Sequence, residues 1–136
     1  MSIVSMRSFS NLGDDRGSLV VLNQLQEIPF TVKRVYYIYG TKDEVSRGFH
    51  AHKELHQLAI CVSGSCRMVL DDGHSREEIL MQSPEVGVDL PPFLWHEMHD
   101  FSSDCVLLVL ASDLYNEDDY IRDYEEFLDR QKNDEI

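Results

Sequence analysis

Short runs rich in apolar residues occupy most of the chain, and most of them end at turn residues. The seven runs that we expect to form strands cover residues 17–25, 31–40, 56–64, 65–73, 85–92, 93–101 and 105–112. These runs are rich in β-branched and aromatic residues, and Gly64 and Gly73 lie where hairpin turns need a positive φ. The spacing predicts an all-β fold, either an antiparallel β-barrel or a β-sandwich.

Near residue 117 the strand-like runs end, and apolar residues recur with the spacing of a helix. The apolar residues that recur there are Tyr120, Ile121, Tyr124, Phe127 and Leu128. Asn116 can cap the start of a helix, and the acidic residues 117–119 suit the positive end of its dipole. The sequence therefore predicts one C-terminal α-helix over about residues 117–131, with an apolar stripe that packs on the barrel of its own chain.

Length and composition fit one domain over residues 1–136. Hydrophobic residues make up 43% of the chain, and neither a repeat nor a linker divides it. No apolar run approaches the ~18 residues of a membrane span, and no signal-peptide pattern opens the sequence, so we expect a cytoplasmic protein. Cys61, Cys66 and Cys105 are an odd number without C-x-x-C spacing, and we interpret them as small buried hydrophobic residues.

The formal net charge of −13 argues against a nucleic-acid partner, because binding to a polyanion needs clustered Lys and Arg. Much of the negative charge lies in the C-terminal tail, so the rest of the chain repels an anion less than the total suggests. One or two arginines in a cleft can hold a diphosphate bidentately whatever the net charge. We therefore expect no nucleic acid and no membrane as partners, whereas a small phosphorylated ligand fits.

The residues that could bind a ligand or catalyse a reaction lie in the stretch RGFHAHKELHQ, which begins at Arg47. In a strand, residues two apart point to the same face, so His50 and His52 project together. Two imidazoles beside the guanidinium of Arg47 are costly to bury without a purpose. The segment therefore predicts a functional site, which either holds a metal ion or moves protons.

The same stretch resembles the first cupin motif, in which His-x-His is followed by an acidic position and a glycine; here these are His50, His52, Gln57 and Gly64. PPFLWH resembles the second cupin motif and ends at His96. In metal-binding cupins the position of Gln57 is a glutamate, and a neutral amide is a weaker ligand for a hard divalent ion. Three histidines alone can hold zinc with an open position. The departure at Gln57 nevertheless predicts a site without a metal.

Longer stretches resemble the nucleoside-diphosphate-sugar 3,4-ketoisomerases. They are IPFTVKRVYYIYGTKDEVSRGFHAHKELHQ, GSCRMVLDDG and WHEMHDFSSDCVLLVLASDLYNEDDYIRDYEEF, and the likeness covers about residues 17–127. Members of that family are metal-free cupins that act on dTDP-4-keto-6-deoxyglucose and dimerise, often by exchanging N-terminal strands. The resemblance implies a cupin-type jelly roll, a homodimer without a cofactor, a dTDP-linked 4-keto-6-deoxy sugar as substrate, and a dTDP-3-keto-6-deoxyhexose of glucose or galactose configuration as product.

Moving a ketone from carbon 4 to carbon 3 requires a base that removes the proton on carbon 3, and histidine suits this role near neutral pH. With this resemblance, we expect His50 and His52 to share the acid–base work, with His52 preferred as the base. A more distant likeness of RGFH to the dTDP-sugar epimerases favours His50 instead. Arg47 is expected to hold the diphosphate or the enediolate oxygen, and His96 to face the cavity and orient the substrate or the base.

Three further side chains complete the expected site. Tyr37 is the phenol that donates a proton or a hydrogen bond to the sugar oxygens, and strand alternation puts Tyr36 on the opposite face. Gln57 is expected to contact the substrate. Arg16 is expected at the mouth of the site, in its own subunit or in the neighbouring one. Two alternatives stay open, namely a metal-dependent cupin enzyme and a sugar-nucleotide-binding module without chemistry.

Overall fold

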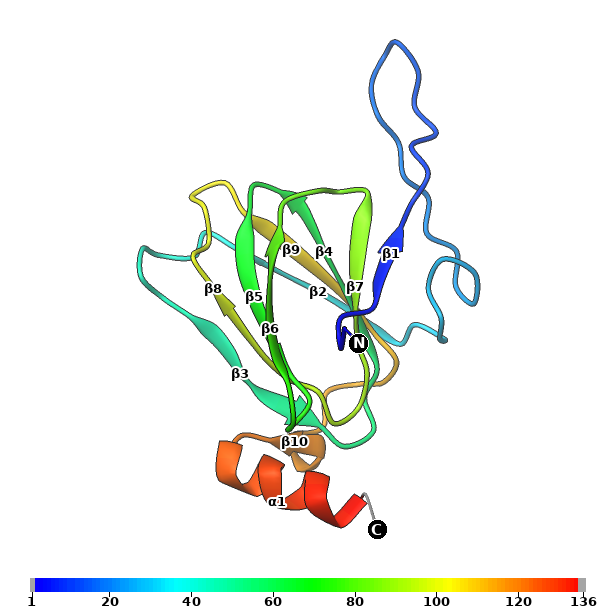
Figure 1. The fold of residues 1–136 in the computed structure, drawn as a ribbon. Helices are drawn as coiled ribbons and strands as arrows, with labels where there is room; N and C mark the ends of the chain where they lie inside the picture. The colour runs from blue at the N-terminus through cyan, green and yellow to red at the C-terminus, as the bar shows by residue number, and fades with distance from the viewer. Residues whose placement is uncertain (1, 135–136) are drawn as a thin grey trace.

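Two antiparallel sheets face each other in the computed structural model, which describes residues 2–134 (Figure 1). The first sheet contains, in spatial order, β1 (Met6–Ser8), β7 (Val86–Leu90), β4 (Gln57–Ser63), β9 (Val106–Ala111) and β2 (Arg34–Tyr39). The second sheet contains β10 (Tyr120–Ile121), β3 (Arg47–His52), β8 (Trp95–His99), β5 (Cys66–Asp71) and β6 (Arg76–Met81). Strands that follow one another along the chain often lie in opposite sheets, as in a jelly roll, so the predicted all-β fold is confirmed.

The main core lies between the two sheets. Inward-pointing residues of β5 and β9 that are buried in it are Met68, Leu70, Leu107 and Val109. Their spacing of two follows from the alternation of side chains along a strand. The cysteines Cys61, Cys66 and Cys105 belong to the same core as free thiols. Their interpretation as buried hydrophobic residues is therefore confirmed.

Six of the seven predicted strands are confirmed within a few residues, as β2, β4, β5, β7, β8 and β9. The predicted strand over residues 17–25 is wrong, since this part of the chain forms only isolated bridges. Figure 1 shows part of the segment between β1 and β2 projecting beyond the two sheets. No strand of the described chain pairs with residues 17–25, and Leu19 and Leu25 are 54% and 66% exposed, whereas Val20 and Leu22 pack against the cluster that contains Ile60.

The predicted helix over residues 117–131 is divided into three elements. These are a 3-10 turn (Glu117–Asp119), the strand β10 (Tyr120–Ile121) and the helix α1 (Tyr124–Asp134). β10 pairs with β3, and the carboxylate of Asp119 accepts the backbone N–H groups of Glu54 and Leu55. These tertiary hydrogen bonds outweigh the local helical pattern. Asn116 acts as an N-cap, as expected, but it caps the 3-10 turn and not an α-helix.

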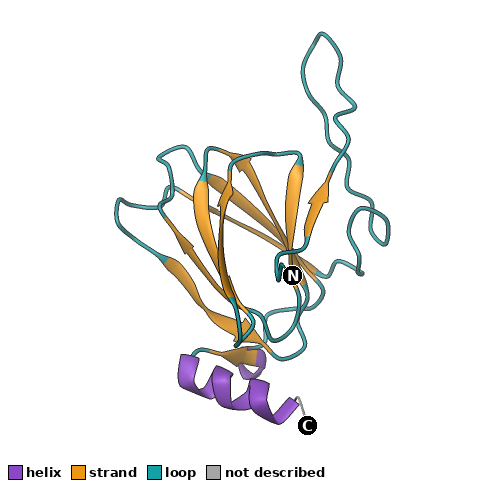
Figure 2. Cartoon of the chain, viewed as in Figure 1, coloured by secondary structure: helices purple, strands orange, loops and turns teal. Residues whose placement is uncertain are grey.

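Helix α1 lies across one end of the two sheets (Figure 2). Its residue Phe127 is fully buried in a cluster with Ala51, Trp95 and Ile121. The expectation that the apolar stripe packs on its own barrel is therefore confirmed. Among residues 2–134, no helix is long and apolar enough to cross a membrane.

Candidate active site

The histidine cluster is built by two adjacent strands of the second sheet. β3 carries His50 and His52, and the antiparallel register places His96 of β8 directly opposite His50. The ring centroid of His50 lies 5.0 Å from that of His52 and 4.6 Å from that of His96. One nitrogen from each ring lies within 4.8 Å of the other two. The structure thus brings together all three histidines that the sequence nominated.

A β-bulge in β3 sets the direction in which these imidazoles point. The register shifts between Gly48 and His50, and Phe49 between them has a φ of +62°. Gly48 itself has a φ of +89°, and a Cβ there would lie 2.9 Å from the carbonyl oxygen of His96. Only glycine fits this close approach, and a bulge of this kind re-aims the side chain that follows it. The glycine of RGFH therefore positions His50.

Backbone carbonyls fix the tautomer of two of the rings. Nδ1 of His50 lies 3.1 Å from the carbonyl oxygen of Gly48, and Nδ1 of His96 lies 3.2 Å from that of Leu94. Because a carbonyl oxygen only accepts, each Nδ1 carries the hydrogen and donates it, and the lone pair is left on Nε2. Neutral His50 therefore offers Nε2 as a base.

Burial keeps all three imidazoles neutral at neutral pH. Desolvation lowers the pKa of His50 to about 4 and that of His52 to about 3. It also lowers the pKa of His96 well below its usual value. Repulsion from nearby cationic groups, such as Arg122, acts in the same direction on His50 and His52. Each ring is thus in the form that can accept a proton.

An open cavity of about 430 Å³ lies in front of His50. It is lined by Arg34, Tyr36, Ile38, Ser46, Arg47, Gly48, His50, Met98, Tyr120 and Arg122. Three of these residues are arginines, although the net charge of the chain is −13, and one of them, Arg122, forms a 2.9 Å ion pair with Glu117. The guanidinium of Arg122 lies 4.2 Å from the ring centroid of Tyr120. Because arginine suits bidentate recognition of phosphate, the cavity fits a phosphorylated ligand.

Gln57 is fully buried, and its two polar atoms differ in their partners. The hydroxyl of Tyr36 donates a 2.6 Å hydrogen bond to Oε1, whereas Nε2 has no hydrogen-bond partner within the described chain. Burial raises the pKa of Tyr36 to about 12, so this phenol keeps its proton. His50, His52 and His96 could hold a metal ion, but the fourth position offers a neutral amide whose oxygen is already engaged. The donor set favours proton chemistry.

Comparison with known proteins places the chain in a family. The family described as "FdtA: WxcM-like, C-terminal" matches residues 2–132. The chain belongs to the FdtA family. This member is 58% identical over 120 residues to the TDP-4-oxo-6-deoxy-alpha-D-glucose-3,4-oxoisomerase of Aneurinibacillus thermoaerophilus, and the match covers 88% of this chain and 86% of that protein.

Solved structures resemble this FdtA-family chain along nearly its whole length. A 3,4-ketoisomerase from Helicobacter canadensis has a TM-score of 0.92 and 48% identity, and the match covers 97% of this chain and 99% of that one. QdtA, a sugar 3,4-ketoisomerase from Thermoanaerobacterium thermosaccharolyticum in complex with TDP, has a TM-score of 0.94 and 41% identity, with 98% and 97% covered. The expected ketoisomerase family and cupin-type fold are confirmed.

The predicted site residues of this FdtA-family chain lie in two layers. Arg47 and His50 line the open cavity. His52, His96 and Gln57 are buried behind it. Trp95, the residue before His96 in β8, packs against Phe127 of α1.

Tyr37 and Arg16 are not brought to the cavity of their own chain. Tyr37 lies on the outer face of β2, where it is 61% exposed and its ring centroid is 6.0 Å from that of Tyr39. The alternation that separates the two faces of β2 holds, but the phenol that it turns inward is Tyr36. Arg16 lies on the projecting segment before β2 and forms a 2.6 Å ion pair with Asp14.

The cavity residues that the sequence did not nominate are Arg34, Tyr36, Tyr120 and Arg122. Arg34 and Tyr36 share the inward face of β2, so the alternation of RVYYIY was the signal that could have found them. Tyr120 and Arg122 lie where the local pattern is helical, and only the pairing of β10 with β3 places Tyr120 opposite His52. No local signal links these two residues to the histidines.

Proposed function

We propose that this chain is a 3,4-ketoisomerase that converts TDP-4-oxo-6-deoxyglucose to a TDP-3-keto-6-deoxyhexose of glucose or galactose configuration. The observation that carries the proposal is that the lone pair of His50 lies on Nε2, beside an open cavity lined by three arginines. The name of the Aneurinibacillus relative supports this substrate. So does a histidine-to-asparagine variant of QdtA, which was solved with TDP-4-keto-6-deoxyglucose.

In this reaction Nε2 of His50 accepts the proton from carbon 3 of the sugar. The electron pair of that C–H bond forms the double bond between carbons 3 and 4, and the carbonyl oxygen on carbon 4 becomes an enolate oxygen. The hydroxyl proton on carbon 3 then passes to the oxygen on carbon 4, and carbon 4 takes up a proton. His52, whose ring centroid is 5.0 Å away, shares the acid–base work. The product is the 3-ketone, and no oxidant or reductant is needed.

Hydrogen-bond donors around the cavity stabilise the enediolate. We assign Arg47 to the diphosphate or to the enediolate oxygen. Tyr36 takes the donor role that the sequence suggested for Tyr37, because its phenol lines the cavity and keeps its proton. When the substrate is bound, the hydroxyl of Tyr36 gives up its hydrogen bond to Oε1 of Gln57 and donates to a sugar oxygen instead. His96 supports the base from behind, and Gln57 orients Tyr36 through the hydrogen bond to its hydroxyl.

We further propose that the protein acts as a cytoplasmic homodimer. Apolar side chains that are more than half exposed are Leu12, Leu19 and Leu25 on the projecting segment and Val35, Tyr37 and Tyr39 on β2. Contact with a second copy would remove this apolar surface from water. Arg16 lies on the same segment and would reach the neighbouring site. Light scattering should give a dimer that L19D weakens, and a wild-type monomer at all concentrations would contradict this.

The test of the activity uses chelator-treated protein and TDP-4-oxo-6-deoxyglucose in deuterium oxide, followed by proton NMR. We expect exchange of the carbon 3 proton and the signals of a 3-keto product. H50N should lower the rate by about 10²- to 10⁴-fold, the usual contribution of a general base. Full activity in both H50N and H52N would refute the acid–base assignment.

Two results would favour the other functions instead. Loss of activity on chelation and its recovery with a divalent metal would indicate a metal-dependent cupin enzyme. Tight binding of the sugar nucleotide without any proton exchange would indicate a binding module. The same NMR samples separate all three cases.

A further inference from the structure

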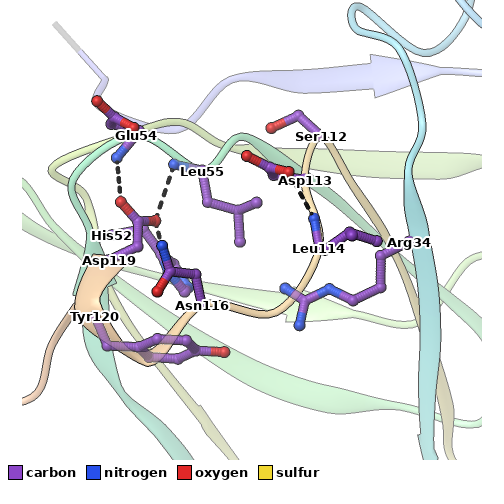
Figure 3. Close-up of a pocket in the computed structure, with 10 residues that line it drawn as sticks. All are labelled: Arg34, His52, Glu54, Leu55, Ser112, Asp113, Leu114, Asn116, Asp119 and Tyr120. Carbon is purple, nitrogen blue, oxygen red and sulfur yellow. Dashed lines mark hydrogen bonds and ion pairs between the residues drawn. The ribbon is translucent and has the colours of Figure 1, made fainter.

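A second and smaller cavity, of about 60 Å³, lies beside His52 (Figure 3). Its lining includes Asp119, together with Arg34 and Tyr120, which also line the larger cavity. His52 itself lines the smaller cavity and not the larger one. The two cavities therefore contact different histidines of the cluster, with His50 on one side and His52 on the other.

Asp119 is held firmly at the wall of this smaller cavity. Oδ1 accepts the backbone N–H of Glu54 at 2.9 Å, and Oδ2 accepts that of Leu55 at 3.1 Å (Figure 3). The same Oδ2 lies 3.5 Å from Nδ1 of His52. The carboxylate therefore has a fixed position, and that position faces a single nitrogen of the imidazole.

His52 has polar atoms that the rest of the described chain does not satisfy. Its side chain is only 4% exposed, and neither Nδ1 nor Nε2 has a hydrogen-bond partner within residues 2–134. An unpaired buried polar atom destabilises the folded state, so such groups require an explanation. The distance of 3.5 Å to Asp119 is too long for a good hydrogen bond, but the cavity beside both groups exceeds the ~15 Å³ that one bridging water needs.

We propose that Asp119 is a positioning residue that holds His52 as the Nδ1–H tautomer, directly or through one water, and stabilises the imidazolium when His52 takes a proton. A carboxylate only accepts hydrogen bonds, so it selects the tautomer with the hydrogen on the facing nitrogen. Nε2 of His52 then carries the lone pair. The carbonyls of Gly48 and Leu94 select the same tautomer in His50 and His96.

This inference rests on the proposed ketoisomerase activity, and it makes His52 the partner that exchanges a proton with the base. The competing interpretation is that Asp119 only caps the backbone that follows β3, through Glu54 and Leu55. The two interpretations differ in what they predict for the His52 ring and for kcat.

The matched variants are D119N and D118N. Asp118 is the neighbouring residue, its side chain is exposed, and the same substitution there removes one negative charge without touching His52. We expect D119N to lower kcat by about 10- to 100-fold, as loss of an orienting partner of histidine does elsewhere, and to leave KM within about twofold. D118N should keep wild-type kcat. Equal kcat in the two variants would overturn the proposal.

Nitrogen NMR of ¹⁵N-histidine-labelled protein reads the tautomer directly, with H52N used to assign the signals. In the wild type we expect Nδ1 of His52 to be protonated and Nε2 not, and in D119N a mixture of tautomers. An Nε2–H tautomer in the wild type would overturn the proposal even if D119N does not fold. A drop in kcat with an unchanged tautomer would indicate the capping role instead. Wild-type protein that is inactive on the nucleotide sugar would refute the proposed function, whereas the tautomer measurement tests Asp119 separately.

Discussion

Acidification from pH 7 to pH 5 should strongly destabilise this protein through its three buried histidines. In the folded state the pKa of His50 is about 4, that of His52 is about 3 and that of His96 is well below its usual value. In an unfolded chain a histidine has a pKa of about 6.5. Between pH 6.5 and pH 4 the unfolded state therefore binds more protons than the folded state. The contribution of these histidines to the free energy of unfolding is fully present above about pH 6.5 and is lost as the pH falls below that value.

The size of this loss at pH 5 depends mainly on the unfolded pKa, because the folded pKa values of His50 and His52 both lie below 5. At 1.5 pH units below the unfolded pKa, each of these two histidines lowers the free energy of unfolding by about 2 kcal/mol. Together they lower it by about 4 kcal/mol, and His96 acts in the same direction. Since a typical domain has only ~5–15 kcal/mol of stability, the effect should be easy to measure.

The assay is urea denaturation at pH 7 and at pH 5, at one protein concentration, followed by the fluorescence of the single tryptophan, Trp95. Each of H50N and H52N should reduce the loss between the two pH values by about 2 kcal/mol, and H96N should also reduce it. If the three variants lose as much stability as the wild type, the buried imidazoles titrate normally and the electrostatic account of the site is wrong.

Three other substitutions test separate parts of the structure. Y36F should lower kcat about 10²-fold in a steady-state assay, as loss of one oxyanion donor does, and Y37F should lower it less; the reverse order would return the donor role to Tyr37. Q57E restores an anionic donor beside the histidines, so elemental analysis should find more bound divalent metal than in the wild type, and an equal content would argue against a metal-competent geometry. F127A removes a fully buried ring of α1 and should cost about 3–5 kcal/mol in chemical denaturation; a wild-type midpoint would show that α1 contributes little.

Most of the sheet could be predicted because alternation is a local property of a strand. β2 is exposed at every second position, and β5 and β9 are apolar runs of strand length that end near turn residues. β6 was missed because its sequence, REEILM, is that of an edge strand with charged residues on the exposed side. Residues 17–25 have a strand pattern but no partner strand in the described chain. Pairing is a property of the whole fold, and the pattern alone does not contain it.

The site divides in the same way. The spacing of His50, His52 and His96 was readable because the bulge and the register of two adjacent strands bring them together. To choose between Tyr36 and Tyr37, one must know which face of β2 points inward. The position of the second sheet decides this, and the sequence of β2 alone does not show it. Asp119 lies in an acidic tail that resembles a solvated helix, and only the hydrogen bonds to the backbone after β3 place it beside His52.

Gln57 stands where metal-binding cupins have a glutamate, and the loss of that negative charge bears on the acid–base chemistry of the histidines. A glutamate there would place a negative charge beside the three imidazoles and favour a bound cation, whereas the amide leaves the cluster neutral and accepts a hydrogen bond from the hydroxyl of Tyr36. A neutral cluster buried in this way has low pKa values, and the free enzyme therefore binds a proton weakly. An anionic diphosphate sugar in the arginine-lined cavity would raise the pKa of His50 towards neutrality. The base would then be strong enough only when the substrate is bound, and it would release the proton again to carbon 4, as an isomerase requires.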